Sequence, residues 1–285
     1  MTDELRHFLL ICDHGTFTAA SRHAHLSQPA LTASIQRLEH QVGAVLFHRG
    51  PRGAVPTAAG EVLRPFAEAA LGAIEQGRRA VRAIATLEHG EVRIGAGAMA
   101  CGYLLPERLT AFRSQHPGIE LQLRELVASK VERRVETGHL DLGIVANSPV
   151  AEAWGEDLLV LVSAPHHPPP AAHVTFFPGA NHRAILDDQF PEVPVAMELN
   201  SLEAVKAHVM AGMGIALLSY TAVEGELKRG RLVEVIDART PVVRKLGLLH
   251  AGDARLSPAA RALRDHLLAH PPTVAYESRS PVRKG

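Results

Sequence analysis

Cysteine, net charge and long apolar runs are all scarce in this chain of 285 residues. Its two cysteines, Cys12 and Cys101, are too few for a disulfide framework, which favours a reducing compartment. Lys plus Arg equals Asp plus Glu at 30 each, so any nucleic-acid surface must be local. No apolar run approaches the roughly 20 residues of a spanning helix, and "MTDELRHFLLIC" does not read as a signal peptide. We therefore expect a cytoplasmic protein.

Motifs for catalysis and metal binding are missing as well. There is no G-x-S-x-G, and the 17 histidines lack Cys or carboxylate partners at ligand spacing. Residues 95–100, "GAGAMA", do fit the G-x-G-x-x-A dinucleotide pattern after a predicted strand. However, a helix starting near Gly97 would hold Pro106 in its interior, whereas one starting near Tyr103 places it in the first turn. We expect no enzyme, cofactor or metal; the alternative is an NAD(P)-binding enzyme with a DNA-binding arm.

The N-terminal pattern predicts three helices. The first has one apolar face, formed by Leu5, Phe8, Leu9 and Cys12, and Gly15 ends it. Thr18 is the expected N-cap of a short second helix. Ser27 caps a third helix, and Pro29 lies in its first turn, where a missing N–H is harmless. Two short helices with a tight turn predict a helix-turn-helix over about residues 17–36, whose second helix enters the DNA major groove.

The third helix is expected to have two distinct faces. Its inward face consists of Leu31, Ser34, Ile35, Leu38 and Val42. Gln28, Thr32 and Gln36 recur every four residues on another face, and Gly43 ends the helix. Gln pairs with adenine edges and Thr contacts thymine methyl groups, so this face suits base recognition; an ordinary solvated face is the alternative.

A glycine- and arginine-rich loop follows the third helix. In "LFHRGPRGAVPT", Arg49 and Arg52 stand among Gly50, Pro51 and Gly53, a pattern that predicts a hairpin wing. Arginine in such a wing grips phosphate or enters the minor groove. The alternative is a loop that serves solubility.

Residues 17–60 resemble the winged helix-turn-helix of LysR-type transcriptional regulators. The resemblance rests on "SQPALT" (27–32), "IQRLE" (35–39), "LFHR" (46–49) and "TAAG" (57–60), with Pro56 where the family usually has Leu. With the patterns above, it indicates a DNA-binding domain over 1–58. The DNA-binding candidates are Thr18, Ser27, Gln28, Pro29, Thr32, Gln36, Arg49 and Arg52.

Residues 59–89 are predicted to form one long linker helix after the N-cap Thr57. One apolar stripe consists of Val62, Phe66, Ala69, Ala73, Ala80, Ile84 and Leu87, and a second of Leu63, Ala70, Ile74 and Val81. Pro65 is expected to kink it. A small domain cannot cover both stripes, so the expected partner is the same helix of a second chain. The resemblance implies dimers that often assemble into tetramers.

From residue 90 onward strands alternate with helices, which predicts an α/β domain with a parallel sheet. The resemblance implies a periplasmic-binding-protein-like effector domain over 90–270, with two subdomains and crossovers near 144–149 and 247–252. Subdomain I is expected over about 90–146 and 252–270, subdomain II over about 150–247, and a flexible tail over 271–285. Ser219 replaces the Pro that the family usually has after "GIALL". The predicted fold class is therefore α+β in two parts, with a winged helix-turn-helix and an α/β effector domain.

Ligands of such folds bind where strand ends meet helix N-termini, which favour anions. Asn200 is the expected cap of one such helix, with Glu203 completing a capping box. The loop after the first predicted strand of the effector domain, "AMACG" (98–102), has fewer hydroxyl groups than the family usually carries there. Fewer hydroxyl groups make fewer contacts with a carboxylate, so a larger or more apolar effector also fits. The effector-binding candidates are Ala100, Cys101, Ser129, Asn200 and Ser201.

These patterns predict a sequence-specific DNA-binding transcriptional regulator whose activity a small-molecule effector modulates. Its partners are double-stranded promoter DNA, an effector for which an anion is suited, a second copy of the chain, and RNA polymerase if it activates. The alternative is a thiol-based redox sensor acting through Cys101, which lies near a predicted helix N-terminus, where thiol pKa values fall.

Overall fold

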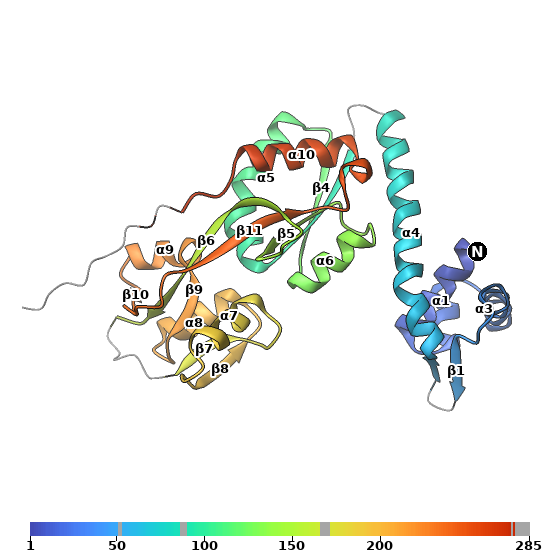
Figure 1. Ribbon diagram of the computed structural model, residues 1–285, viewed down its shortest axis with the longest axis horizontal. Coiled ribbons are helices and arrows are strands. Elements are labelled where there is room, and N and C mark those ends of the chain that lie inside the picture. Colours follow the sequence, from blue (N-terminus) through green and yellow to red (C-terminus); the bar gives the residue numbers. More distant parts are fainter. Residues whose placement is uncertain (51–52, 86–89, 166–171, 275, 277–285) are drawn as a thin grey trace, which may run out of the picture. The chain divides into compact units, whose positions relative to one another are not determined.

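The computed structural model describes residues 1–50, 53–85, 90–165, 172–274 and 276, and the chain forms two compact units (Figure 1). The first unit consists mainly of residues 1–81 and the second of most of the remainder. In this described part, no helix has the length and apolarity needed to cross a membrane. Most of the expected tail lies outside the description, since residues 275 and 277–285 are not part of it.

Three helices form the body of the first unit: α1 (Thr2–His14), α2 (Phe17–His23) and α3 (Gln28–Val42). The Ser27 hydroxyl accepts a hydrogen bond from the backbone N–H of Ala30 at 3.3 Å, which confirms the predicted cap of α3. Left-handed glycines end α1 and α3, at φ 67° for Gly15 and 72° for Gly43, as predicted. The fully buried core of this unit includes Phe8, Ile11, Leu31, Ile35 and Leu38.

Two predictions for these helices are wrong. The N-cap of α2 is Thr16, whose hydroxyl accepts from the backbone N–H of Ala19 at 3.0 Å, and Thr18 is therefore an exposed residue of the first turn. Both threonines satisfy the sequence preference for a cap, and the extended backbone of Thr16 decides between them. Val42 is 42% exposed, because it is the last residue of α3 and extends beyond the core.

The predicted wing is an antiparallel hairpin of β1 (Phe47–Gly50) and β2 (Gly53–Pro56). Arg49 lies in β1 opposite Ala54, but its side chain and all of Arg52 lie outside the described residues. The Thr57 hydroxyl then accepts from the N–H of Gly60 at 3.1 Å and starts α4 (Ala58–Ala85), which contains Pro65. Residues 86–89, the predicted end of this helix, are not described.

Among the described residues of the second unit, one mixed sheet has seven strands. The strands are β3 (Gly90–Ala96), β4 (Ile119–Glu125), β5 (Leu142–Ala146), β6 (Glu152–Ser163), β9 (Ala216–Ser219), β10 (Val233–Glu234) and β11 (Val242–Leu249). Their order is β10-β6-β11-β5-β3-β4, and β9 pairs with β6. Strand β3 is parallel to β4 and β5, whereas β11 is antiparallel to both β5 and β6.

The helices and strands of this unit form two subdomains (Figure 1). Subdomain I comprises β3, β4 and β5 with α5 (Leu105–Gln115), α6 (Ala128–Glu136) and α10 (Pro258–Ala269). Subdomain II comprises β9, β10 and the parallel pair β7 (His173–Phe176) and β8 (Val195–Leu199), with α7 (Asn181–Gln189), α8 (Leu202–Met210) and α9 (Tyr220–Lys228). A short 3-10 turn, Asp253–Arg255, precedes α10.

Strands β6 and β11 connect the two subdomains and run side by side between them (Figure 1). Their pairing extends from Val242 opposite Leu159 to Leu248 opposite Glu152. The crossovers predicted near 144–149 and 247–252 are therefore displaced, because the crossing strands are residues 152–163 and 242–249. The first half of β6, "EAWGED", carries three carboxylates, and this polar composition hides its strand character in the sequence.

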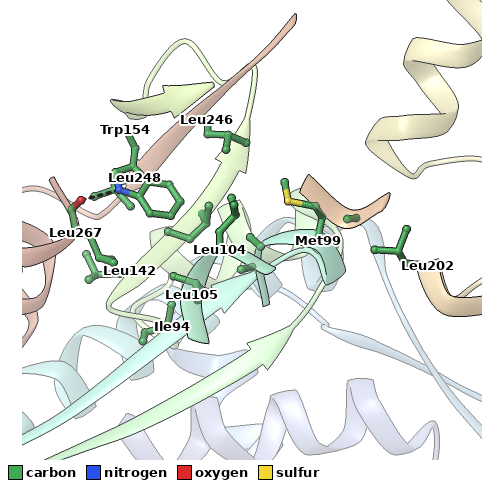
Figure 2. Close-up of a cluster of buried hydrophobic side chains, with 14 of the residues drawn as sticks. Ile94, Met99, Leu104, Leu105, Leu142, Trp154, Leu202, Leu246, Leu248 and Leu267 are labelled. Atoms are coloured by element: carbon green, nitrogen blue, oxygen red, sulfur yellow. Dashed lines mark hydrogen bonds between the residues drawn. The ribbon is translucent and has the colours of Figure 1, made fainter. Parts of the chain in front are cut away.

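Side chains of β6 point alternately to the two faces of the sheet and contribute to the hydrophobic core on each face. Val160 and Val162 join the core that contains α8 and α9, whereas Leu159 and Leu161 pack with α7 residues on the other face. Figure 2 shows the larger core, in which the indole N–H of Trp154 donates to the carbonyl of Leu267 at 2.7 Å. This bond ties β6 to α10 and satisfies a buried donor.

The start of the first helix in subdomain I also differs from expectation. Helical structure begins at Ala98 rather than near Tyr103, and 100–104 is a π-helical turn in which the Leu105 N–H donates to the Ala100 carbonyl. Pro106 follows directly, in the first turn of α5. A π-turn contains one more residue than an α-helical turn, so its hydrogen bonds join residues five apart. The next residue, Pro106, has no N–H and therefore needs no acceptor in the preceding turn. Pro106 therefore does not exclude a helix that starts beside Gly97.

His173 is an ionisable group buried in subdomain II. It is 0% exposed, its ring packs edge-on against Phe190 at 5.7 Å, and neither ring nitrogen has a hydrogen-bond partner among the described residues. Burial lowers the pKa of His173, because a charged ring loses its hydration there.

This lowered pKa predicts a loss of stability in mild acid. The unfolded chain binds a proton near its ordinary pKa of about 6.5, so the contribution of His173 is complete above that pH and is lost as pH falls toward the lowered pKa. His173→Leu should flatten the pH dependence of the free energy of unfolding by up to about 1.4 kcal/mol per pH unit. Urea unfolding between about pH 5 and 7, followed by Trp154 fluorescence, measures this slope. A wild-type slope in His173→Leu would contradict the assignment.

Candidate functional site

The first candidate site is the polar face of α3. Gln28, Pro29 and Gln36 are exposed and Thr32 is half-buried, so the face predicted for base recognition is open to solvent. Ser27 is exposed as well, but its hydroxyl is engaged in capping the helix. The buried side of α3 fixes the helix on the core, which leaves this face free for a partner.

The other DNA-binding candidates lie in two further segments of the first unit. Thr18 is exposed in the first turn of α2, and Arg49 belongs to β1 of the hairpin. Arg52 is outside the described residues. Helix, turn, helix and hairpin thus occur in the order that the sequence predicts.

The second candidate site is a cleft of about 380 Å³ in the second unit, with walls from both subdomains. The wall of subdomain I consists of residues 97–100, 125–128, Lys130 and 144–146. The opposite wall consists of Phe176, 180–182, Asn200 and Leu202, and the crossing strand β11 adds Arg244 and Leu246. Several of these segments are helix N-termini, whose free N–H groups favour an anionic ligand.

The cleft brings together two of the five predicted effector residues. Ala100 and Asn200 line it from opposite subdomains. Within the described residues, its lining does not include Cys101, Ser129 or Ser201. Ser129 is exposed on α6, one position before the lining residue Lys130, because successive residues of a helix point in different directions.

The N-terminus of α8 corrects the predicted capping box. Its N-cap is Ser201, whose hydroxyl accepts from the Ala204 N–H at 3.5 Å, so Asn200 is not the cap. The Glu203 carboxylate instead accepts from the Tyr103 hydroxyl at 2.6 Å, and the Lys206 ammonium donates to the same hydroxyl at 2.9 Å. These bonds connect subdomain I, through Tyr103, to subdomain II.

The cleft also contains charged groups that the sequence patterns did not single out. Lys130 and Arg244 are cations in the lining, and Glu125 is an anion. The Arg244 guanidinium pairs with Asp157 at 2.5 Å, and the Ser219 hydroxyl donates to the other Asp157 oxygen at 2.6 Å. Ser219 thus supplies a hydrogen bond that the family's usual Pro lacks. Asp157 and Arg244 lie 87 residues apart in sequence, so no local pattern connects them.

The surroundings of Cys101 disfavour thiol chemistry. Its side chain is half-buried, and the thiol donates to the Ala96 carbonyl at 3.5 Å. Burial raises the pKa of Cys101 to about 11, so the reactive thiolate is scarce at neutral pH. Elsewhere in the described part of the chain, no group of three or more His, Cys, Asp or Glu residues is arranged to hold a metal ion.

Both units match families of known proteins. The family described as "LysR substrate binding domain" matches residues 85–272, and "Bacterial regulatory helix-turn-helix protein, lysR family" matches residues 2–61. Neither description names an enzyme family.

Individual relatives are similar over nearly the whole chain. The HTH-type transcriptional regulator CfxR of Cupriavidus necator is 31% identical, over 94% of this chain and 90% of its own length. The RuBisCO operon transcriptional regulator of Allochromatium vinosum is 28% identical, over 93% and 95%. The crystal structure of CbnR, a LysR family transcriptional regulator, has a similar fold, with a TM-score of 0.69 at 18% identity over 96% of this chain and all of that one. The chain therefore belongs to the LysR family of DNA-binding transcriptional regulators, with an N-terminal helix-turn-helix domain and a C-terminal substrate-binding domain.

Proposed function

We propose that the chain reads a specific operator through α3, with Gln28 and Thr32 at base edges and Arg49 and Arg52 on the backbone or in the minor groove. The observation that carries this proposal is the exposed polar face at the N-terminus of α3, in a unit that also contains a hairpin. The N-terminal residues of a recognition helix are those that contact bases, and arginines on a wing neutralise phosphates.

Gln28→Ala should relax sequence preference at one operator base pair. A lost bidentate contact with adenine costs roughly 1–3 kcal/mol of discrimination, whereas affinity for unrelated DNA should hardly change. Competition binding with operators mutated one base pair at a time measures the difference. Gln41→Ala is the matched control, since Gln41 is also exposed on α3, about 20 Å along the helix from Gln28 at 1.5 Å per residue. Intact discrimination in Gln28→Ala would mean that α3 is oriented differently on DNA.

The second part of the proposal is that a small-molecule effector binds in the cleft and changes operator binding. A volume of about 380 Å³ suits a small metabolite. Because both subdomains line the cleft, a ligand that touches both binds one subdomain arrangement better than others and shifts the population toward it. Asn200 and Ala100 face such a ligand from opposite subdomains. Ser129, Cys101 and Ser201 remain candidates for contacts in another subdomain arrangement.

The target genes are best identified by footprinting the bound sites across the genome. The name of the Allochromatium vinosum relative makes a RuBisCO operon the first target to examine. RNA polymerase would be a further partner if transcription rises at these sites. The alternative of a redox sensor is disfavoured, because burial opposes formation of a Cys101 thiolate.

A further inference from the structure

Two side chains on one wall of the cleft have hydrogen-bond donors without an acceptor. Arg244 is 4% exposed; its guanidinium pairs with Asp157 at 2.5 Å and contacts the Asn181 side-chain oxygen at 3.3 Å. Its Nε–H is buried and has no partner among the described residues. The Nε2 atom of His182 is likewise buried and unpartnered there. Both residues line the cleft.

The contact between these residues defines which atom of His182 carries the proton. A guanidinium nitrogen of Arg244 lies 3.4 Å from His182 Nδ1. Arginine only donates, so Nδ1 accepts and the ring proton resides on Nε2. Burial, together with the nearby Arg244 charge, lowers the pKa of His182 well below its usual value, so the ring is neutral and has a single N–H. The free nitrogens of both residues are therefore donors and require an oxygen acceptor.

The backbone adds further donors at the same place. His182 is the second residue of α7, a nine-residue helix whose N-cap, Ala180, makes no side-chain cap bond. Ala180 also lines the cleft. Free N–H groups and the helix dipole at such an end favour negative charge. Asp157 does not supply the missing acceptor: its oxygens accept from a terminal Arg244 nitrogen and from Ser219, and neither Arg244 Nε nor His182 Nε2 has a hydrogen-bond partner among the described residues.

We propose that this wall is an oxyanion subsite, in which His182 Nε2–H, Arg244 Nε–H and the start of α7 bind a carboxylate or phosphate group of the effector. The inference rests on the proposed effector function and names the chemistry that the ligand must carry. It places the anionic group against α7 and β11, away from Ser129.

The test measures anion binding to the full-length chain. Thermal unfolding is followed by fluorescence of Trp154, the single tryptophan, which is buried in the second unit. Inorganic phosphate and acetate are titrated separately, at constant ionic strength maintained with chloride. A ligand that binds the folded state raises the unfolding midpoint by mass action, so phosphate, acetate or both should raise it in a saturable way. A response to phosphate alone indicates a phosphoryl group in the effector, and a response to acetate alone indicates a carboxylate.

Variants locate the binding. His182→Phe keeps the ring but removes the donor and should weaken anion binding about tenfold or more, whereas His182→Gln retains an N–H donor and should keep most of it. Arg244→Lys keeps the charge beside Asp157 but removes Nε and should weaken binding similarly. Arg239→Lys is the matched control, because Arg239 lies outside the cleft lining and pairs with Asp237 and Glu192.

Two results would overturn the inference: no midpoint shift beyond that of chloride in the wild type, or equal shifts in His182→Phe and Arg239→Lys. Operator binding by the same samples tests the proposed function separately. Absence of an anion response in the wild type, with intact operator binding, rejects this subsite alone. Conversely, an anion response without specific DNA binding rejects the proposed regulator and leaves the subsite in place.

Discussion

Asp157→Ala is expected to destabilise the second unit by about 3–5 kcal/mol, the largest stability effect that we predict for a single substitution. Asp157 and Arg244 are 1% and 4% exposed, and their ion pair joins β6 to β11. Removing the carboxylate leaves a guanidinium charge buried with no counter-ion, and it also deprives Ser219 of its acceptor. The free energy of unfolding therefore falls by the cost of an uncompensated charge, which exceeds the value of the pair itself.

Urea unfolding followed by Trp154 fluorescence measures this effect in the unit that contains the pair. Asp187→Ala is the matched control: Asp187 also pairs with an arginine, Arg183, but it is 56% exposed, so a loss of at most about 1 kcal/mol is expected. Replacing Asp157 and Arg244 together by leucine should recover most of the stability, since no lone charge remains. A similar unfolding midpoint for Asp157→Ala and Asp187→Ala would show that water reaches the Arg244 charge.

Phe66→Glu is expected to separate a dimer and to lower affinity for a paired operator about 10²–10⁴-fold, the largest functional effect that we predict. In α4, an exposed apolar stripe comprises Val62, Phe66, Ala70, Ala73, Ile74 and Val81. Val62, Phe66, Ala70 and Ala73 recur at steps of three or four, Ile74 follows Ala70 by four and Val81 follows Ile74 by seven, so all six lie on one helical face. We expect the same helix of a second chain to cover this face. The side chain of Ile84, part of the predicted stripe, lies outside the described residues. In a symmetric dimer, the glutamate introduced at position 66 would be buried and would repel the same glutamate of the second chain.

Sedimentation equilibrium and operator binding are measured on the same samples. Binding of a single half-site should be nearly unchanged, because the fold of α1–α3 does not depend on Phe66, which is 69% exposed. Glu75→Lys is the control that changes a charge on α4 away from the stripe, at an exposed position paired with Arg78. An intact oligomer in Phe66→Glu would place the subunit contact elsewhere.

Local signals in the sequence are sufficient to place the helix ends and the hairpin of this protein. Ser27, Gly15, Gly43 and Thr57 mark helix ends because a cap or a left-handed turn involves residues within about four positions. The hairpin at 47–56 follows from Gly50 and Gly53, which end β1 and begin β2, and from the proline after Gly50 in the sequence. The helix-turn-helix, the wing and the alternation of strands and helices could therefore be predicted. The error at Thr18 arose where two threonines satisfied the same local rule.

Which residues line the cleft depends on how distant segments of the chain pack together. Its walls come from segments spread over residues 97–246, and the direction of each side chain depends on how its helix or strand packs. Ala100 and Asn200 could be predicted from loop positions, but Arg244, His182 and Lys130 could not, since nothing near them in sequence indicates their neighbours. The ion pair of Asp157 with Arg244 joins residues 87 positions apart, and it exists because β6 and β11 lie side by side. Local sequence sets the backbone of single elements, whereas pairing between distant strands sets the chemistry of the site.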